Sequence, residues 1–330
     1  MILKQLFDQA TWTYTYLLAD SKTREAVIID PVVEKVERDL KLIAELGLKL
    51  VYTLDTHVHA DHVTGSGKLR TATGAFSVVS AVADVECVDQ SVAHGDRIRF
   101  GALELEVRST PGHTDGCLTY VVDADGQMMA FTGDALLIRG CGRTDFQQGS
   151  AEVLYRSVRT QLYTLPSDTI IYPGHDYRGH TASTVAEEKA HNPRLKVEIA
   201  EVEFIQLMAD LDLAYPKRIH DALPANLACG VVSKGREEAP APCAIKELSP
   251  GQFSTFSGGR VVDVRSSEEF QGELGHLPEA LLTPLAELRY KAVTWLRDVP
   301  LLVVCRSGRR SIHGCSMLVE MGFTNVTNLS

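Results

Sequence analysis

The chain has 330 residues, 45% of them hydrophobic and 23% charged, and its formal net charge is −10. This mixture is typical of a globular protein with room for two domains, and it excludes a wholly disordered or fibrous chain. The acidic balance speaks against an extended basic face, so we expect neither nucleic acid nor an anionic membrane as a partner.

The first part of the chain alternates strand and helix patterns, which predicts an α/β domain. Apolar runs predict strands at residues 14–19, 26–30, 48–54, 76–80, 103–109, 118–122, 128–131 and 169–172. Amphipathic periodicity predicts helices at residues 34–46, 152–163 and 181–191. We assign residues 1–232 to this domain.

The composition changes after this domain. Alternating Pro and Ala with interspersed charges predicts an extended linker at residues 233–245. A second, smaller α/β pattern follows at residues 246–330. Its predicted strands cover residues 260–264 and 301–304, and its predicted helices cover residues 267–270, 284–296 and a segment that begins at Ser311.

Residues 56–62, Thr-His-Val-His-Ala-Asp-His, bring four side chains of metal-ligand type close together in the sequence. His57 and His59 share one face of an extended strand end, whereas Asp61 and His62 stand where a helix could begin. Imidazole and carboxylate groups are ligands for Zn, Fe and Mn. A solvated polar loop is the alternative, but the density of ligand-type residues favours a metal site.

Three further candidate ligands, His113, Asp134 and His175, follow predicted strands and stand next to Gly or Pro. Gly and Pro allow the backbone to turn sharply, and loops at strand ends usually carry chemistry. Each of these signals is weak by itself. Together they predict one site at which several strand ends meet.

The combined motif resembles the signature of the metallo-β-lactamase superfamily over about residues 1–230. The resemblance implies an αββα sandwich, in which two β-sheets lie between layers of helices. Within the superfamily, residues 139–149 and 172–179 resemble the persulfide dioxygenases. That family binds one Fe(II), and no other cofactor is implied.

The persulfide dioxygenase resemblance implies that His57, His113 and Asp134 bind the iron as a 2-His-1-carboxylate set. The other side chains of ligand type would then orient ligands and water; they are His59, Asp61, His62 and His175. Because the sequence also keeps every residue of the superfamily's two-zinc site, spacing alone does not identify the metal. The prediction of iron rests on the family resemblance.

The implied reaction converts glutathione persulfide, O₂ and water to glutathione and sulfite. Because glutathione carries two carboxylates, we expect it to contact Arg143, Arg139 and Tyr177. Redox-inert zinc would instead favour hydrolysis by a metal-bound hydroxide. A zinc-dependent thioester hydrolase of the glyoxalase II kind is therefore the alternative for this domain.

An apolar strand run at residues 301–304 leads into Cys305 and a basic loop before the last predicted helix. Backbone N–H groups and a helix N-terminus at this position lower the pKa of a thiol and bind anions. Such a thiolate accepts sulfane sulfur and holds it as a persulfide. The loop residues that we expect around Cys305 are Arg306, Ser307, Gly308, Arg309 and Arg310.

This second domain resembles a rhodanese-like sulfurtransferase, on residues 261–265, residues 275–278 and the cysteine loop. The resemblance implies a parallel sheet and sulfur transfer among persulfide, sulfite and thiosulfate. It also implies that Asp263 and Arg265 order the loop. A docking module that relays sulfur to a partner protein is the alternative for this domain.

The sequence as a whole predicts a persulfide dioxygenase–rhodanese fusion that acts on small molecules, with glutathione as the sulfur carrier. The seven cysteines show no regular disulfide spacing, which indicates free thiols in a reducing compartment. The chain also lacks a secretory signal pattern and the ~20-residue apolar run of a membrane span. We therefore expect a cytoplasmic protein without a membrane partner, and the sequence leaves homo-oligomerisation open.

Overall fold

The computed structural model describes residues 1–83, 85, 88–211, 218–228, 245–256, 258–272, 275–285, 288–292, 295–306 and 308–329. The chain divides into two compact units, Met1–Ser233 and Lys234–Ser330. The linker expected at residues 233–245 lies outside the described residues, apart from its last position, Ile245.

Two six-stranded sheets form the centre of the first unit, as far as its residues are described. The first sheet has the order β1(Ile2–Asp8), β2(Thr13–Ala19), β3(Glu25–Ile29), β4(Lys49–Leu54), β5(Phe76–Ser80) and β6(Gln90–Val92). The second has the order β12(Ser183–Thr184), β11(Ile170–Pro173), β10(Gln127–Gly133), β9(Leu118–Ala124), β8(Leu103–Ser109) and β7(Arg97–Phe100). The strands β3 to β6 run parallel, and β10 runs parallel to β11. Parallel strands end at a common edge, which brings their following loops together.

Alternating side chains explain why each sheet buries both faces. In β9, Tyr120 packs into the core between the two sheets, whereas its neighbour Val121 packs with the helices outside the second sheet. In β10, Phe131 likewise packs between the two sheets, and its neighbour Ala130 packs with the outer helices. Successive side chains of a strand point to opposite faces of the sheet. Apolar residues at both the odd and the even positions of a strand therefore predict a sheet that is covered on both faces.

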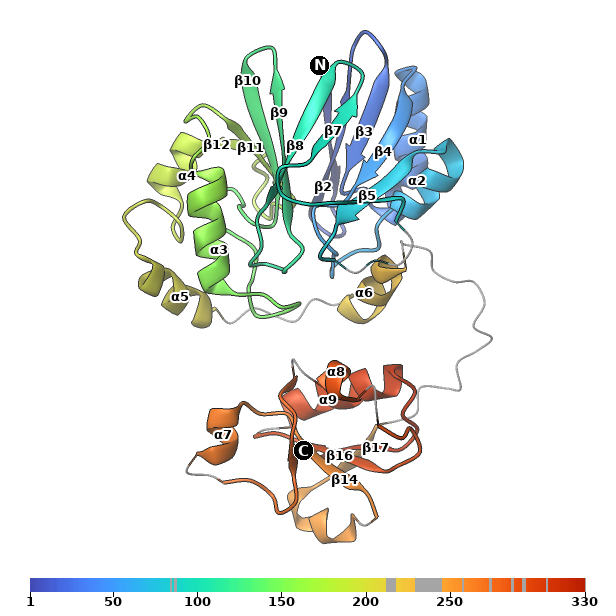
Figure 1. Ribbon diagram of the computed structural model, residues 1–330, viewed down its shortest axis with the longest axis vertical. Helices are drawn as coiled ribbons and strands as arrows, with labels where there is room; N and C mark the ends of the chain where they lie inside the picture. The colour runs from blue at the N-terminus through green and yellow to red at the C-terminus, as the bar shows by residue number, and fades with distance from the viewer. Residues whose placement is uncertain are drawn as a thin grey trace. The chain divides into compact units, whose positions relative to one another are not determined.

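Helices cover the outer faces of both sheets (Figure 1). After the short turn η1(Val33–Lys35), α1(Val36–Glu45) and α2(Ser66–Thr73) pack on the first sheet. The second sheet is covered by α3(Ala151–Ser157), its π-helical continuation η2(Val158–Leu162), α4(Val185–His191) and α5(Glu201–Ala209). The last described helix of this unit is α6(Ile219–Leu227). This layer order confirms the predicted αββα sandwich.

Some element boundaries differ from the sequence-based expectations. The helix expected at residues 152–163 changes from α to π geometry after Ser157. The helix expected at residues 181–191 begins only at Val185, because the preceding two residues pair with β11 as a short strand. The helix that could begin at Asp61 and His62 begins only at Ser66, as α2, whose fully buried apolar side chain is that of Leu69.

The second unit is built on a parallel sheet. Its described strands have the order β13(Lys246–Leu248), β17(Val326–Leu329), β16(Leu301–Val304), β14(Arg260–Asp263) and β15(Leu281–Leu282). The described helices are η3(Pro250–Thr255), α7(Ser267–Gln271), α8(Leu288–Ala292) and α9(Arg309–Glu320). The parallel sheet confirms the prediction, whereas the helix expected at residues 284–296 is represented by the shorter α8. Among the described helices of the chain, none has the length and apolar character needed to cross a membrane.

Candidate metal centre and sulfur-transfer loop

The histidine-rich segment lies in the loop between β4 and α2, at the end of a parallel strand. The structure brings it together with the ends of β10 and β11 and with the loop between β8 and β9. His57, His59 and His62 are buried, with 4% or less of their surface exposed. All seven predicted ligand-type residues therefore meet at one place, although they come from four separate parts of the sequence.

A first donor set consists of His57, His113 and Asp134, whose ligand-type atoms all lie within 4.8 Å of one another. His113 donates its Nδ1 hydrogen to the backbone carbonyl of Arg143 at 2.7 Å. Its Nε2 therefore carries the lone pair, and this atom lies 3.7 Å from Asp134 Oδ2. In His57, Nδ1 lies 3.0 Å from the hydroxyl of Thr56, which leaves Nε2 for a ligand. Such hydrogen bonds fix which ring nitrogen can bind a metal.

A second donor set consists of His59, Asp61 and His62, again with ligand-type atoms within 4.8 Å of one another. His59 Nδ1 and His62 Nε2 are buried and have no hydrogen-bond partner among the described residues. His175 connects this set to the first, since its Nδ1 lies 2.7 Å from Asp134 and its Nε2 lies 3.0 Å from Asp61. Buried imidazole nitrogens without partners fit a cation-binding site, because such polar atoms are otherwise hydrogen-bonded.

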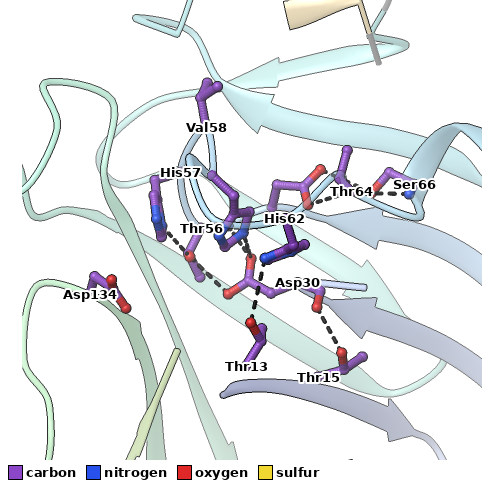
Figure 2. A network of polar contacts seen from close by, with 12 residues as sticks. Thr13, Thr15, Asp30, Thr56, His57, Val58, His62, Thr64, Ser66 and Asp134 are labelled. Atoms are coloured by element: carbon purple, nitrogen blue, oxygen red, sulfur yellow. Dashed lines mark hydrogen bonds and ion pairs between the residues drawn. The ribbon is translucent and has the colours of Figure 1, made fainter. Parts of the chain in front are cut away.

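Asp30 supports the histidine-rich loop from the end of β3, and sequence analysis missed it. Its carboxylate accepts hydrogen bonds from the backbone N–H of Thr56 at 2.7 Å and from the Thr56 hydroxyl at 2.8 Å. The same carboxylate lies 3.1 Å from Nε2 of His59. Figure 2 shows Asp30 beneath the loop, with Thr56 between it and His57. One buried carboxylate thus orients the rings of two candidate ligands.

Charge explains how buried carboxylates remain ionised in this site. Burial by itself raises the pKa of Asp134, but His175, His113 and His57 together hold that pKa well below its usual value. Burial lowers the pKa of His175, but Asp134 and Asp61 raise it well above its usual value. Asp134 and Asp61 therefore share a cationic partner in His175, and a bound metal ion would also compensate their charge.

The three residues expected to contact glutathione have different surroundings. Arg143 forms a bidentate ion pair with Asp145, both contacts being 2.7 Å, and its guanidinium lies 4.1 Å from the ring centre of Phe146. Tyr177 is 61% exposed, and its ring lies parallel to that of His175 with 6.2 Å between the centroids. Arg143 and Tyr177 therefore border the metal-centre residues.

Arg139, by contrast, takes part in an ion-pair network on α4. Its guanidinium contacts Glu187 and the fully buried Glu188, and its backbone N–H donates to Glu188 at 2.9 Å. Its φ of 55° lies in the left-handed region, where few residues other than Gly are found. The network holds this turn of the segment between β10 and α3 in place.

Cys305 directly follows β16, and α9 begins four residues later at Arg309. Its Sγ lies 3.3 Å from the backbone N–H and 3.3 Å from the hydroxyl of Ser311. Gly308 has a φ of 76°, which turns the chain into the helix. The thiol of Cys305 is therefore partly exposed at the start of a helix, where backbone N–H groups favour a negative charge.

The charged residues around this loop are partly neutralised by ion pairs. Arg310 binds Glu269 through two contacts of 2.7 and 2.6 Å. Arg265 binds Asp263 and also donates to the backbone carbonyl of Glu269. Because Glu269 in turn binds Arg310, the Asp263–Arg265 pair is connected to the cysteine loop through Glu269. Arg306 is exposed, whereas Ser307 and the side chain of Arg309 lie outside the described residues.

The other described cysteines are poor nucleophiles. Burial raises the pKa of Cys117 to about 12, that of Cys141 to about 11 and that of Cys315 to about 12. A raised pKa keeps a thiol protonated, so near pH 8 about one in a thousand of these groups or fewer is ionised. We expect iodoacetamide to label Cys305 at least about 10-fold faster than these three thiols. Peptide mapping by mass spectrometry checks this prediction, and equal labelling of Cys141 would contradict it.

Comparisons with known proteins agree with this architecture. Residues 13–175 match the model of the metallo-beta-lactamase superfamily, and residues 250–330 match that of the rhodanese-like domain. The chain is 54% identical over 232 residues to the mitochondrial persulfide dioxygenase ETHE1 of Mus musculus, and the match covers 70% of this chain and 89% of that protein.

One solved structure and one further relative are also similar to the first unit. The crystal structure of ETHE1 from Myxococcus xanthus is 53% identical with a TM-score of 0.67, covering 70% of this chain and 100% of that one. A hydroxyacylglutathione hydrolase of Cereibacter sphaeroides is 37% identical over 192 residues, covering 57% of this chain and 72% of that protein. The chain therefore belongs to the metallo-β-lactamase superfamily and, within it, to the persulfide dioxygenase family, with a rhodanese-like domain as its second unit.

Proposed function

We propose that the first unit oxidises glutathione persulfide with O₂ at an iron centre, and that the second unit transfers sulfur through Cys305. The observation that carries the proposal is the donor set of His57, His113 and Asp134, in which His57 and Asp134 are buried, His113 is partly buried and the ligand-type atoms lie within 4.8 Å of one another. This set occurs in a chain that is 54% identical to a persulfide dioxygenase. Two observations therefore support the proposal, namely the geometry of the donor set and the similarity to a persulfide dioxygenase.

Two imidazole nitrogens and one carboxylate oxygen of this set would hold one Fe(II) and leave coordination positions open. His57 donates its Nδ1 hydrogen to the Thr56 hydroxyl, and His113 donates its own to the carbonyl of Arg143, so both rings are preset for this role. When bound, the ferrous ion supplies redox chemistry with O₂ that redox-inert zinc does not. His175 and Asp61 would orient the carboxylate of Asp134 and ordered water beside it.

The reaction consumes one persulfide, one O₂ and one water, and yields one glutathione, one sulfite and two protons. The sulfane sulfur loses the electrons that O₂ gains, and its bond to the glutathione sulfur breaks. We assign Arg143 and Tyr177 to binding glutathione, with Arg143 exchanging its contact with Asp145 for a substrate carboxylate. We assign Arg139 to holding the loop, because its guanidinium is already paired with Glu187 and Glu188.

In the second unit, Cys305 would carry sulfur as a persulfide. Sulfite attacks the outer sulfur, so a new sulfur–sulfur bond forms while the bond to Cys305 breaks and the thiolate leaves. The product is thiosulfate, and the cysteine is restored. The N–H and hydroxyl of Ser311, each 3.3 Å from Sγ, would stabilise the thiolate that leaves.

A zinc-dependent thioester hydrolase is the second candidate for the first unit. It is favoured by the second donor set, in which His59 Nδ1 and His62 Nε2 have no hydrogen-bond partner among the described residues. Metal analysis of the purified full chain separates the candidates. One iron per chain supports the dioxygenase, whereas two zinc ions with hydrolysis of an S-acylglutathione support the hydrolase.

The glycine at position 142 provides a test of the first donor set. A Cβ at Gly142 would lie 2.6 Å from the carbonyl oxygen of Asp134 and 2.9 Å from ring atoms of His113. We expect Gly142→Ala to displace the backbone at Asp134 and the ring of His113, and so to weaken metal binding by about 10- to 100-fold. Gly140→Ala is the matched control, because a Cβ there meets, among the described residues, only Leu137 Cβ at 3.9 Å. Equal metal affinity for both variants, measured by chelator competition, would contradict the assignment.

The thiol chemistry requires a reducing compartment. Cys117, Cys141, Cys305 and Cys315 are free in the described part of the chain. The mouse relative is a mitochondrial protein by name. We propose that this chain works where glutathione is reduced, which the cytoplasm and the mitochondrial matrix both provide.

A further inference from the structure

The histidine-rich loop depends on other segments for its backbone hydrogen bonds. Residues 55–63 form neither helix nor strand, so their buried polar groups need partners from elsewhere. Asn226 of α6 supplies two of these partners, because its Nδ2 donates to the carbonyls of His59 and His62, each at 2.8 Å. Its Oδ1 also accepts from the backbone N–H of Thr64 at 2.8 Å. One side chain thus holds three points along the loop.

The surroundings of Asn226 fix its amide group. The residue is 5% exposed, and both of its donor hydrogens and its acceptor oxygen are used by the loop. The rest of the loop is held elsewhere: Leu118 donates to the carbonyl of Thr56, and Gln147 donates to the carbonyl of Val58, both at 2.8 Å. Asn226 therefore supports the backbone of the half of the loop that carries His59, Asp61 and His62, together with Val33, whose N–H donates to the carbonyl of Val63 at 2.9 Å.

The backbone groups that Asn226 holds belong to residues whose rings enter the site. His59 Nδ1 and His62 Nε2 are buried without a hydrogen-bond partner among the described residues, and Asp61 lies between these two residues in the sequence, with its Oδ1 3.9 Å from His59 Nδ1. The position of an imidazole ring follows that of its backbone, because the side chain has only two rotatable bonds. A shift of the His59 and His62 carbonyls would therefore move the donor atoms.

We propose that Asn226 is a positioning residue for the metal centre, which it serves by fixing the backbone from His59 to Thr64. The inference rests on the proposed metal centre, but it does not depend on which metal is bound. It makes α6 part of the machinery of the site, although none of the candidate ligands lies on this helix.

The test uses the full-length apo chain and Co(II) as the probe, because Co(II) reports its coordination through its visible spectrum. We expect Asn226→Ala to raise the Kd for Co(II) by about 10- to 100-fold and to change the d–d absorption bands. Asn226→Asp keeps the acceptor for Thr64 but loses both donors to the histidine carbonyls. We expect this isosteric variant also to raise the Kd for Co(II) and to change the absorption bands. It provides the test if the alanine variant does not fold.

Asn192 offers a matched control for the loss of a buried asparagine. It is fully buried and donates to the carbonyl of Gly140 and to Glu188, neither of which belongs to the two donor sets. We expect Asn192→Ala to lower thermal stability but to keep wild-type Co(II) affinity and spectrum. Wild-type affinity and spectrum in both Asn226 variants, or an equal loss in Asn192→Ala, would overturn the inference. Wild-type protein that binds no Co(II) would overturn the metal centre itself, and the inference with it.

Discussion

Replacing His113 by alanine is expected to remove the metal ion and persulfide-dependent O₂ uptake, while sulfur transfer through Cys305 continues. In the proposed centre His113 would supply one of three donors, and its ring is fixed by a hydrogen bond to the carbonyl of Arg143 at 2.7 Å. Loss of a direct ligand should weaken metal binding and lower O₂ uptake by more than the ~100-fold upper range that is typical for groups that only orient ligands. Metal analysis, an oxygen electrode and a thiosulfate assay on the same preparation measure the three quantities.

His191→Ala is the control for this experiment. His191 is exposed at the end of α4 and belongs to neither donor set. It should keep its metal and both activities. Metal retained in His113→Ala would refute the ligand assignment, and loss of sulfur transfer in that variant would refute the independence of the two sites.

Cys305→Ser should abolish sulfur transfer and leave persulfide-dependent O₂ uptake unchanged. The hydroxyl group of serine does not form a persulfide, so the variant lacks the sulfur-carrying atom. Loss of a covalent nucleophile costs on the order of 10³-fold or more in turnover. The measurement is thiosulfate formation from sulfite and a persulfide donor, with O₂ uptake recorded in parallel.

Cys315→Ala provides the matched cysteine control, because Cys315 is fully buried in the core of the second unit and its pKa is raised to about 12. This variant should keep its sulfur transfer. Loss of both activities in Cys305→Ser would contradict separate sites. A wild-type chain without thiosulfate turnover, but able to donate sulfur to another protein, would favour the relay module instead.

The candidate ligands could be predicted from the sequence because their signals are local. His57, His59, Asp61 and His62 occur together directly after a strand, and a strand end fixes where such a loop must lie. The downstream candidates also follow apolar strands, so a common site required only that these strands end at one edge. The αββα layers were implied by the resemblance to the metallo-β-lactamase superfamily, and the apolar side chains on both faces of the strands agree with them.

The supporting residues could not be predicted in the same way. Asp30 lies 29 residues before His59, and Asn226 lies 167 residues after it, so their contacts depend on how the whole unit packs. A single Asp or Asn has no periodicity or motif that marks it. Arg139 shows the converse: its charge indicated a substrate contact, but the position of α4 places Glu187 and Glu188 against it.

The most direct test of the account is O₂ consumption by the full chain after anaerobic reconstitution with ferrous iron. On addition of fresh glutathione persulfide, we predict rapid O₂ uptake with one sulfite formed for each O₂ consumed and one iron bound per chain. An oxygen trace that stays flat with iron bound, together with hydrolysis of an S-acylglutathione by the zinc-loaded chain, would contradict the proposed dioxygenase.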